Sequence, residues 1–172
     1  MHLRGKLCQG SSGAVVAGIC QGLPAVVKLL GPDASGLAAF HREALAYRLL
    51  QSEQGGVVPR LLAAGHLVAD VHAIVTACIT GVPLSSLATI PPSVAEAARR
   101  ALERVHSVAP GLCHGDVRLQ NIMLQGQVQD QDVGATCMVI DFGRARCGCS
   151  SQQQREEVEH LVSLLKARNR TP

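Results

Sequence analysis

Apolar and polar positions divide the chain into a first part patterned as strands and a second part patterned as helices. In the first part, short runs rich in β-branched residues alternate with turn signals, and they predict strands at residues 14–20, 25–30, 57–64 and 71–79. We expect the last two runs to join through Gly65-His66. Between the two strand pairs, Phe40 and Tyr47 share one face at helical spacing, which predicts a helix over 35–50.

In the second part the apolar period becomes helical. Ser93 and Glu96 have the spacing of a capping box, which predicts a helix start there and a helix that runs to about His106. Short strands are expected at residues 122–124 and 137–140, on either side of a loop.

The last apolar stripe consists of Val158, Leu161, Val162 and Leu165, at positions i, i+3, i+4 and i+7. It predicts a helix over 152–168 whose stripe covers the core. The order of elements therefore predicts one α+β domain over 1–172. It has two lobes, a β-rich N-lobe at 1–79 and a mainly helical C-lobe at 80–172.

Composition excludes several classes of partner. Hydrophobic residues make up 47% of the chain and aromatic residues only 2%, so the core is built mainly from Ala, Val, Leu and Ile. The net charge of +3 is too weak to indicate nucleic-acid binding, and the chain lacks aromatic residues for base stacking. No apolar stretch approaches the roughly 20 residues of a membrane span. We therefore expect neither a nucleic acid nor a membrane as partner.

The seven cysteines fit a reducing compartment. Most lie in apolar runs, where Cys behaves as a small hydrophobic residue. None has the C-x₂-C spacing of a zinc site, and Cys147 and Cys149 form a lone C-x-C for which metal binding is the minor interpretation. The N-terminus has no continuous apolar segment of the kind a signal peptide needs. A cytoplasmic location is expected.

The residues with the clearest chemistry lie in two short segments. Residues 113–121 read C-H-G-D-V-R-L-Q-N, and a later apolar run ends in Asp141-Phe142-Gly143. Such a set supplies what phosphoryl transfer from a nucleotide needs. Asp116 can accept a hydroxyl proton, and Asn121 and Asp141 offer hard oxygen ligands for Mg²⁺.

The spacing H-x-D-x₄-N, followed by D-F-G, resembles that of the protein kinase-like superfamily. The His-Gly-Asp form is similar to that of the aminoglycoside phosphotransferase, choline kinase and atypical kinase branches. The resemblance implies a two-lobed kinase-like fold with ATP between the lobes. It also implies that Asp116 is the catalytic base, that Asn121 and Asp141 hold Mg²⁺, and that Arg118 meets the γ-phosphate. His114 is expected to support the loop through hydrogen bonds.

Two residues of the first part fit the same resemblance. Lys28 lies in the middle of a predicted strand and Glu43 lies 15 residues later at the margin of the helix stripe. Kinases use such a pair to hold the lysine on the α- and β-phosphates. Taken alone, an edge-strand lysine in water and a solvated glutamate explain the two positions as well.

Backbone sites for the nucleotide are weaker signals. Part of the pattern of a glycine-rich phosphate loop is present. Cys8 replaces its first glycine, and the segment that follows supplies Gly10, Ser11, Ser12, Gly13 and Val15. A simple hairpin turn explains this segment equally well. By the resemblance, Thr76 borders the adenine pocket and the backbone of Ala77 to Ile79 bonds the base.

The chain departs from a full protein kinase in its last part. Residues 144–172 contain no A-P-E motif and imply a short, truncated C-lobe. The leading interpretation is an ATP- and Mg²⁺-dependent phosphotransferase whose acceptor is a hydroxyl of a protein or a small molecule. The alternatives are a catalytically inactive, nucleotide-binding pseudokinase or scaffold, and a fragment that needs a partner chain.

Overall fold

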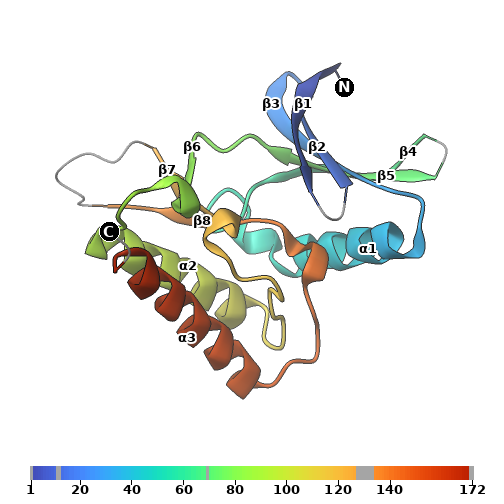
Figure 1. The fold of residues 1–172 in the computed structure, drawn as a ribbon. Coiled ribbons are helices and arrows are strands. Elements are labelled where there is room, and N and C mark those ends of the chain that lie inside the picture. Colours follow the sequence, from blue (N-terminus) through green and yellow to red (C-terminus); the bar gives the residue numbers. More distant parts are fainter. Residues whose placement is uncertain (1, 11–12, 69, 127–133, 171–172) are drawn as a thin grey trace.

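A computed structural model describes residues 2–10, 13–68, 70–126 and 134–170, with the backbone alone for residues 2–10. These residues form two antiparallel sheets and three α-helices (Figure 1). The α+β class expected from the sequence is confirmed. Within the same ranges, no helix is long and apolar enough to cross a membrane.

The larger sheet has five strands in the order β1-β2-β3-β5-β4. Its strands are β1 (His2–Gly10), β2 (Gly13–Cys20), β3 (Leu23–Leu30), β4 (Leu61–Val68) and β5 (Val71–Ala77). β3 is the central strand, where Lys28 is the register partner of Val15 in β2 and of Ile74 in β5. An edge-strand position for Lys28 is therefore wrong.

The turn between β4 and β5 is not where the glycine signal predicted it. Gly65 and His66 lie inside β4, paired with β5, and the chain reverses between Val68 and Val71. Asp70 takes the left-handed conformation there, with φ of 63°. Asp tolerates this region better than most residues, so the turn does not need the glycine.

Helix α1 (Ala34–Leu49) packs against the larger sheet and begins at an Asp33 cap, whose carboxylate accepts the Gly36 N–H at 2.7 Å. Its buried face consists mainly of small residues and includes Ala39, Ala46 and Tyr47. Small side chains let the helix approach the sheet closely. As a result, the middle of α1 lies beside the turn at residues 142–144 (Figure 1).

The second part of the chain combines a small sheet with two helices. The sheet has the order β6-β7-β8 and consists of β6 (Gly81–Pro83), β7 (Ile122–Gln125) and β8 (Cys137–Val139). Helices α2 (Pro92–Val108) and α3 (Ser151–Arg168) lie side by side (Figure 1). One apolar cluster joins Tyr47 of α1, Leu102 of α2 and Leu161 of α3 around Phe142.

The predicted capping box of α2 is wrong. The helix begins one residue earlier than Ser93, with Pro91 at the cap position and no side-chain cap, and Glu96 pairs with Arg99 instead. Pro92 suits the first helical position because it has no N–H, and an N–H at that position would have no partner within the helix. The apolar stripe of α3 is confirmed as part of the core, with Leu161 and Leu165 buried.

Candidate functional site

Three charged side chains from distant parts of the chain meet at one point. The Lys28 Nζ of β3 lies 2.7 Å from the Glu43 Oε2 of α1 and 2.5 Å from the Asp141 Oδ1 that follows β8. The side chains of Lys28 and Glu43 are only 13% and 4% exposed, whereas that of Asp141 is 40% exposed. The predicted pairing of Lys28 with Glu43 is present, and a solvated Glu43 is wrong.

The pKa values at this cluster follow from the balance of burial and charge. Burial raises the pKa of Glu43 despite the opposing charge of Lys28. Burial also pushes the pKa of Asp141 upward, but the charge and hydrogen bond of Lys28 and the Gly143 N–H outweigh it, so this pKa is lowered. For Lys28, burial is outweighed by the two carboxylates and the pKa is raised. The cluster therefore has one ammonium between two carboxyl groups, an arrangement that favours an additional cation.

The backbone around Asp141 is specialised for this contact. Asp141 has φ of 66° and ψ of 71°, a left-handed conformation that is sparsely populated outside glycine and is often found at functional sites. A Cβ on Gly143 would lie 3.0 Å from the Lys28 Nζ, so glycine leaves room for the cluster. Arg42 of α1, which the sequence did not single out, donates to the Gly143 carbonyl at 2.8 Å and ties this turn to the helix.

His114 supports the loop at residues 113–121, as predicted. Its ring is fully buried, its Nε2 lies 2.9 Å from the Ile140 carbonyl, and its Nδ1 accepts the Asp116 N–H at 3.2 Å. This pattern corresponds to a neutral ring with its proton on Nε2. Burial lowers the pKa of His114, which favours the same neutral state. The ring thus joins the loop to the strand end that precedes Asp141.

The Asp116 carboxylate lies at the tip of this loop with two donors on Oδ2. Arg118 Nη2 donates to it at 2.6 Å and Asn121 Nδ2 at 3.2 Å, while Asn121 also donates to the Asp116 carbonyl at 2.9 Å. Because the amide nitrogen of Asn121 faces Asp116, its Oδ1 is left as an acceptor.

Asn121 and Asp141 both line the same cleft, and both residue types carry the hard oxygen atoms that Mg²⁺ prefers. The part of the chain that the structure describes contains no group of three or more His, Cys, Asp or Glu residues arranged to hold a metal. A Mg²⁺ ion here would therefore take its remaining ligands from phosphate and water oxygens, as Mg²⁺ commonly does.

A cleft of about 570 Å³ connects these groups, and we call it the inter-sheet cleft. Its lining includes Lys28, Glu43, Asn121 and Asp141, and the Lys28 ammonium contacts both the Glu43 and the Asp141 carboxylate. Its apolar walls come from both sheets and include Val15, Val26, Ile74, Met123 and Ile140. The predicted residues Thr76, Ala77 and Ile79 also line it. Their positions agree with the expectation for the edge of a binding pocket.

The glycine-rich segment forms the hairpin between β1 and β2. Gly10 pairs with Gly13, and Ser11 and Ser12 lie outside the described residues. Gly13 has φ of 147°, and a Cβ there would fall 1.9 Å from the Leu29 carbonyl oxygen, so this position requires glycine.

The backbone after β5 has less free hydrogen-bonding capacity than expected. The Ala77 N–H donates to the Arg60 carbonyl at 2.8 Å, and the Cys78 N–H donates to the Pro24 carbonyl at 3.0 Å. These two N–H groups therefore have protein partners, and the prediction that backbone groups of Ala77 to Ile79 bond a base stays a prediction. The Ile79 N–H makes no hydrogen bond to any residue that the structure describes.

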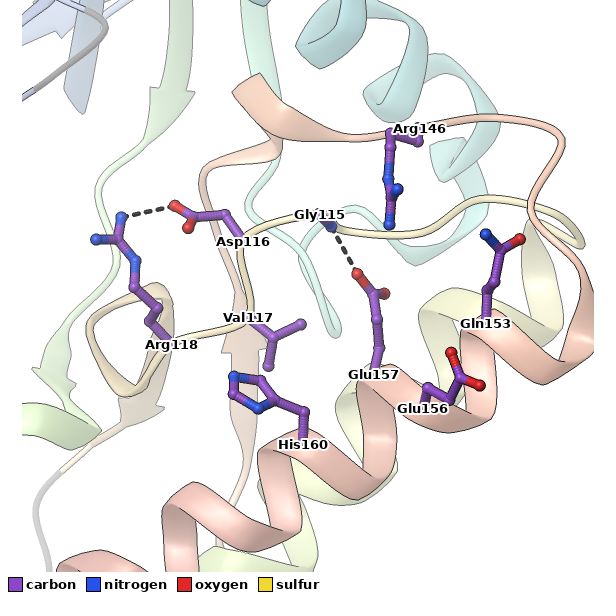
Figure 2. Close-up of a pocket in the computed structure, with 9 residues that line it drawn as sticks. All are labelled: Gly115, Asp116, Val117, Arg118, Arg146, Gln153, Glu156, Glu157 and His160. Atoms are coloured by element: carbon purple, nitrogen blue, oxygen red, sulfur yellow. Dashed lines mark hydrogen bonds and ion pairs between the residues drawn. The ribbon is translucent and has the colours of Figure 1, made fainter.

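Glu157 of α3 is a supporting residue that the sequence did not reveal. Figure 2 shows its carboxylate directed at Gly115: Oε1 accepts the Gly115 N–H at 2.7 Å, and Oε2 accepts the His114 N–H at 2.9 Å. Oε2 also lies 3.0 Å from the His106 Nε2. Burial opposes ionisation, but these hydrogen bonds outweigh it and lower the pKa of Glu157. Its position four residues before Leu161, on the buried stripe, was the available signal.

A second cavity of about 580 Å³ lies between the loop and α3, and we call it the loop pocket. Its lining consists of Gly115, Asp116, Val117, Arg118, Arg146, Gln153, Glu156, Glu157 and His160 (Figure 2). Within the described ranges, Arg118 is the single residue that lines both the loop pocket and the inter-sheet cleft. The two cavities therefore adjoin at Arg118, beside Asp116.

Comparison with known proteins gives no relative: no protein-family model matches the chain, and no curated protein matches it.

Proposed function

We propose that the protein is an ATP- and Mg²⁺-dependent phosphotransferase that transfers the γ-phosphate of ATP to a hydroxyl group, and that its fold is a compact, two-lobed, kinase-like one. The single observation that carries this proposal is Lys28, which bridges Glu43 and Asp141 in the lining of the inter-sheet cleft. Asn121 lines the same cleft and donates to the carboxylate of Asp116.

The inter-sheet cleft supports nucleotide binding by its two kinds of lining. Its apolar walls suit an adenine ring, and the Ile79 N–H is a donor that no described residue uses. Among the charged residues of the lining, Lys28 would donate to the α- and β-phosphates, with Glu43 holding its side chain in place. When Lys28 donates to the phosphates in place of Asp141, its ion pair with Asp141 would break.

Asn121 and Asp141 are the residues that would hold Mg²⁺, through Oδ1 and the carboxylate respectively. When bound, Mg²⁺ would neutralise charge on the β- and γ-phosphates. The left-handed backbone of Asp141 places this carboxylate beside Lys28, and the absence of a side chain at Gly143 leaves room for the contact. The arrangement is one in which the charged groups are positioned before the reaction begins.

Asp116 is the group that would take part in the transfer itself. The acceptor oxygen forms a bond to the γ-phosphorus as the bond from the γ-phosphorus to the bridging oxygen breaks, and ADP leaves with that electron pair. Asp116 accepts the hydroxyl proton and passes it to solvent. Arg118, which is 53% exposed, can move from Asp116 to the γ-phosphate oxygens. His114 and Glu157 hold the loop in position.

One observation favours a second candidate, an inactive nucleotide-binding pseudokinase. The 2.6 Å ion pair between Arg118 and Asp116 occupies the carboxylate that the reaction requires. If this pair persists with nucleotide bound, the Oδ2 of Asp116 is unavailable as a base and the positive charge of Arg118 reduces the basicity of the carboxylate. The two candidates share nucleotide binding and differ in turnover.

A thermal unfolding experiment separates the candidates. Mg·ATP at about 100 times its Kd is expected to stabilise the wild type by about 2.7 kcal/mol, and ATP without Mg²⁺ by much less. Asp116→Asn is expected to keep this stabilisation but to reduce turnover at least ~10²-fold. Asp141→Asn is expected to weaken the dependence on Mg²⁺ itself.

Asp70→Asn is the matched control, because Asp70 also has a left-handed backbone but lies on an exposed turn away from the cleft. It should leave both binding and turnover unchanged. If a folded sample shows no stabilisation at millimolar Mg·ATP, both candidates are wrong. Stabilisation without turnover on any acceptor, and without slow ATP hydrolysis, would leave the pseudokinase.

A further inference from the structure

The loop pocket includes Asp116 in its lining and meets the inter-sheet cleft at Arg118. We infer that it binds the acceptor, and that this acceptor is a small hydroxyl compound with a carboxylate or phosphate group that Arg146 recognises. The inference rests on the proposed function and specifies its acceptor class. The volume of about 580 Å³ is within the range of small-molecule sites.

The position of Arg146 is set by the backbone. Arg146 and Cys113 exchange two main-chain hydrogen bonds, of 2.8 Å and 2.9 Å, so the segment that carries Arg146 is fixed against the start of the loop. Figure 2 shows the guanidinium directed from this segment towards α3, across the pocket from Gln153. A guanidinium in this place can bind a carboxylate or phosphate in bidentate geometry.

The other charges of the pocket already have partners. Asp116 pairs with Arg118 at 2.6 Å, and the carboxylate of Glu157 is bonded by two backbone amides and His106. By contrast, the Arg146 guanidinium makes no ion pair or side-chain hydrogen bond with any residue among those described. It is the cation of this pocket that is left for a ligand.

The opposite choice, a cationic acceptor bound by Glu156, is less favoured by the surroundings. Glu156 accepts a hydrogen bond from Gln152 on its own helix at 3.0 Å. Near Asp116, Arg118 lies at 2.6 Å and Arg144 at 3.9 Å, so two further guanidiniums stand beside the reacting hydroxyl. These guanidiniums attract an anion, whereas the Asp116 and Glu157 carboxylates, which would attract an ammonium group, are already bonded to donors.

A matched set of three-carbon probes tests the acceptor class. Glycerol, glycerate, glycerol 3-phosphate and 3-amino-1,2-propanediol have similar hydroxyl groups but differ in charge. ATP consumption is measured for each probe with Mg²⁺ present, together with thermal stabilisation by Mg·ATP alone. We expect kcat/KM for the two anionic probes to exceed that for glycerol by roughly tenfold, the effect of one charge-assisted hydrogen bond.

Arg146→Gln is expected to remove this preference by raising KM for the anionic probes, with little change in KM for Mg·ATP. Arg155→Gln is the control: it removes the same charge from α3, where Arg155 faces a neighbouring groove and bonds Gln152. The inference is overturned if the anionic probes stimulate ATP consumption no more than glycerol does, or if the amine is preferred and Glu156→Gln abolishes its use. A failure of the proposed function is distinct: either Mg·ATP gives no thermal stabilisation, or it stabilises the protein while no probe, glycerol included, is turned over.

Discussion

The two charged clusters that flank the inter-sheet cleft are held in place in different ways. At the Lys28 cluster, charged side chains from three elements hold one another, and two of the three are largely buried. At the Asp116 loop, His114 and Glu157 hold the backbone, while the side chains of Arg118 and Arg144 are more than half exposed. The geometry of the Lys28 cluster therefore depends on the presence of each charged side chain. The geometry of the Asp116 loop depends on the residues that hold its backbone.

This difference suits the two roles that we propose. A group that binds phosphates through a fixed geometry benefits from a rigid, partly dehydrated environment. A loop that must bind a hydroxyl compound and release a product needs charged side chains that can move and a backbone that stays fixed. The comparison predicts that substitutions will act on stability at the first cluster and on loop geometry at the second.

The largest effect on stability is expected from the scaffold of the loop. Leu161 is fully buried on α3, one turn after Glu157, and Leu161→Ala should cost ~2–5 kcal/mol in the free energy of unfolding. Denaturant unfolding measures this cost. Leu49→Ala, at an exposed leucine of α1, is the control and should stay within ~0.5 kcal/mol. If Leu161→Ala is equally mild and instead abolishes association with a partner, the stripe is a docking face.

The next effect concerns the Lys28 cluster. Lys28→Met leaves Glu43 buried without its cation and should cost about 2–3 kcal/mol, below the value for a fully buried pair because Asp141 is 40% exposed. The double variant Lys28→Met with Glu43→Gln should recover part of this loss, because the unpaired charge is then absent. A double-mutant cycle on unfolding free energies measures the coupling. Purely additive costs would contradict a cluster held together by its charges.

A smaller effect on stability, with a clear effect on the loop, is expected at Glu157. In Glu157→Gln an amide replaces a carboxylate that accepts two backbone N–H groups, so the cost should be about 1–2 kcal/mol. Turnover should fall as well, because the loop that carries Asp116 loses its anchor. Glu159→Gln, on the exposed side of the same helix, is the control. Equal turnover in the two variants would show that the loop is held by other contacts.

The smallest effect is a dependence on pH. Because burial lowers the pKa of His114 in the folded state, the unfolded chain binds a proton more readily below pH 6.5. The contribution of the neutral ring is therefore fully present above pH 6.5 and is lost as the pH falls below it. Unfolding free energies measured between pH 7.5 and 5.5 should decline less steeply in His114→Gln than in the wild type.

Much of the fold could be predicted from local patterns. The strands around Lys28, the helix around Tyr47 and the last helix follow from apolar periods, and each lies within a few residues of its predicted range. The exceptions have local causes as well. Pro92 suits the first turn of α2 without a side-chain cap, and Asp70 forms the turn that Gly65 was expected to form.

The residues of the candidate site also divide into those that a local pattern predicts and those that it does not. Asp116, Asn121 and Asp141 belong to short motifs with a defined spacing, so the sequence alone was enough to single them out as candidates. Glu157 and Arg146 belong to no such motif. Glu157 bonds Gly115 from 42 residues away, and its place on the buried stripe of α3 indicates burial but not this partner.

The sequence by itself determined the class of fold, the order of the elements and the identities of the groups that could carry phosphoryl-transfer chemistry, because periodicity and motif spacing are local properties. The tertiary structure alone decided which charges meet. Lys28 and Asp141 are 113 residues apart, and their 2.5 Å contact exists because the central position of β3, the close approach of α1 and the left-handed backbone at Asp141 coincide. An ion pair depends on distances of a few ångströms, and those distances are set only when the whole chain has packed.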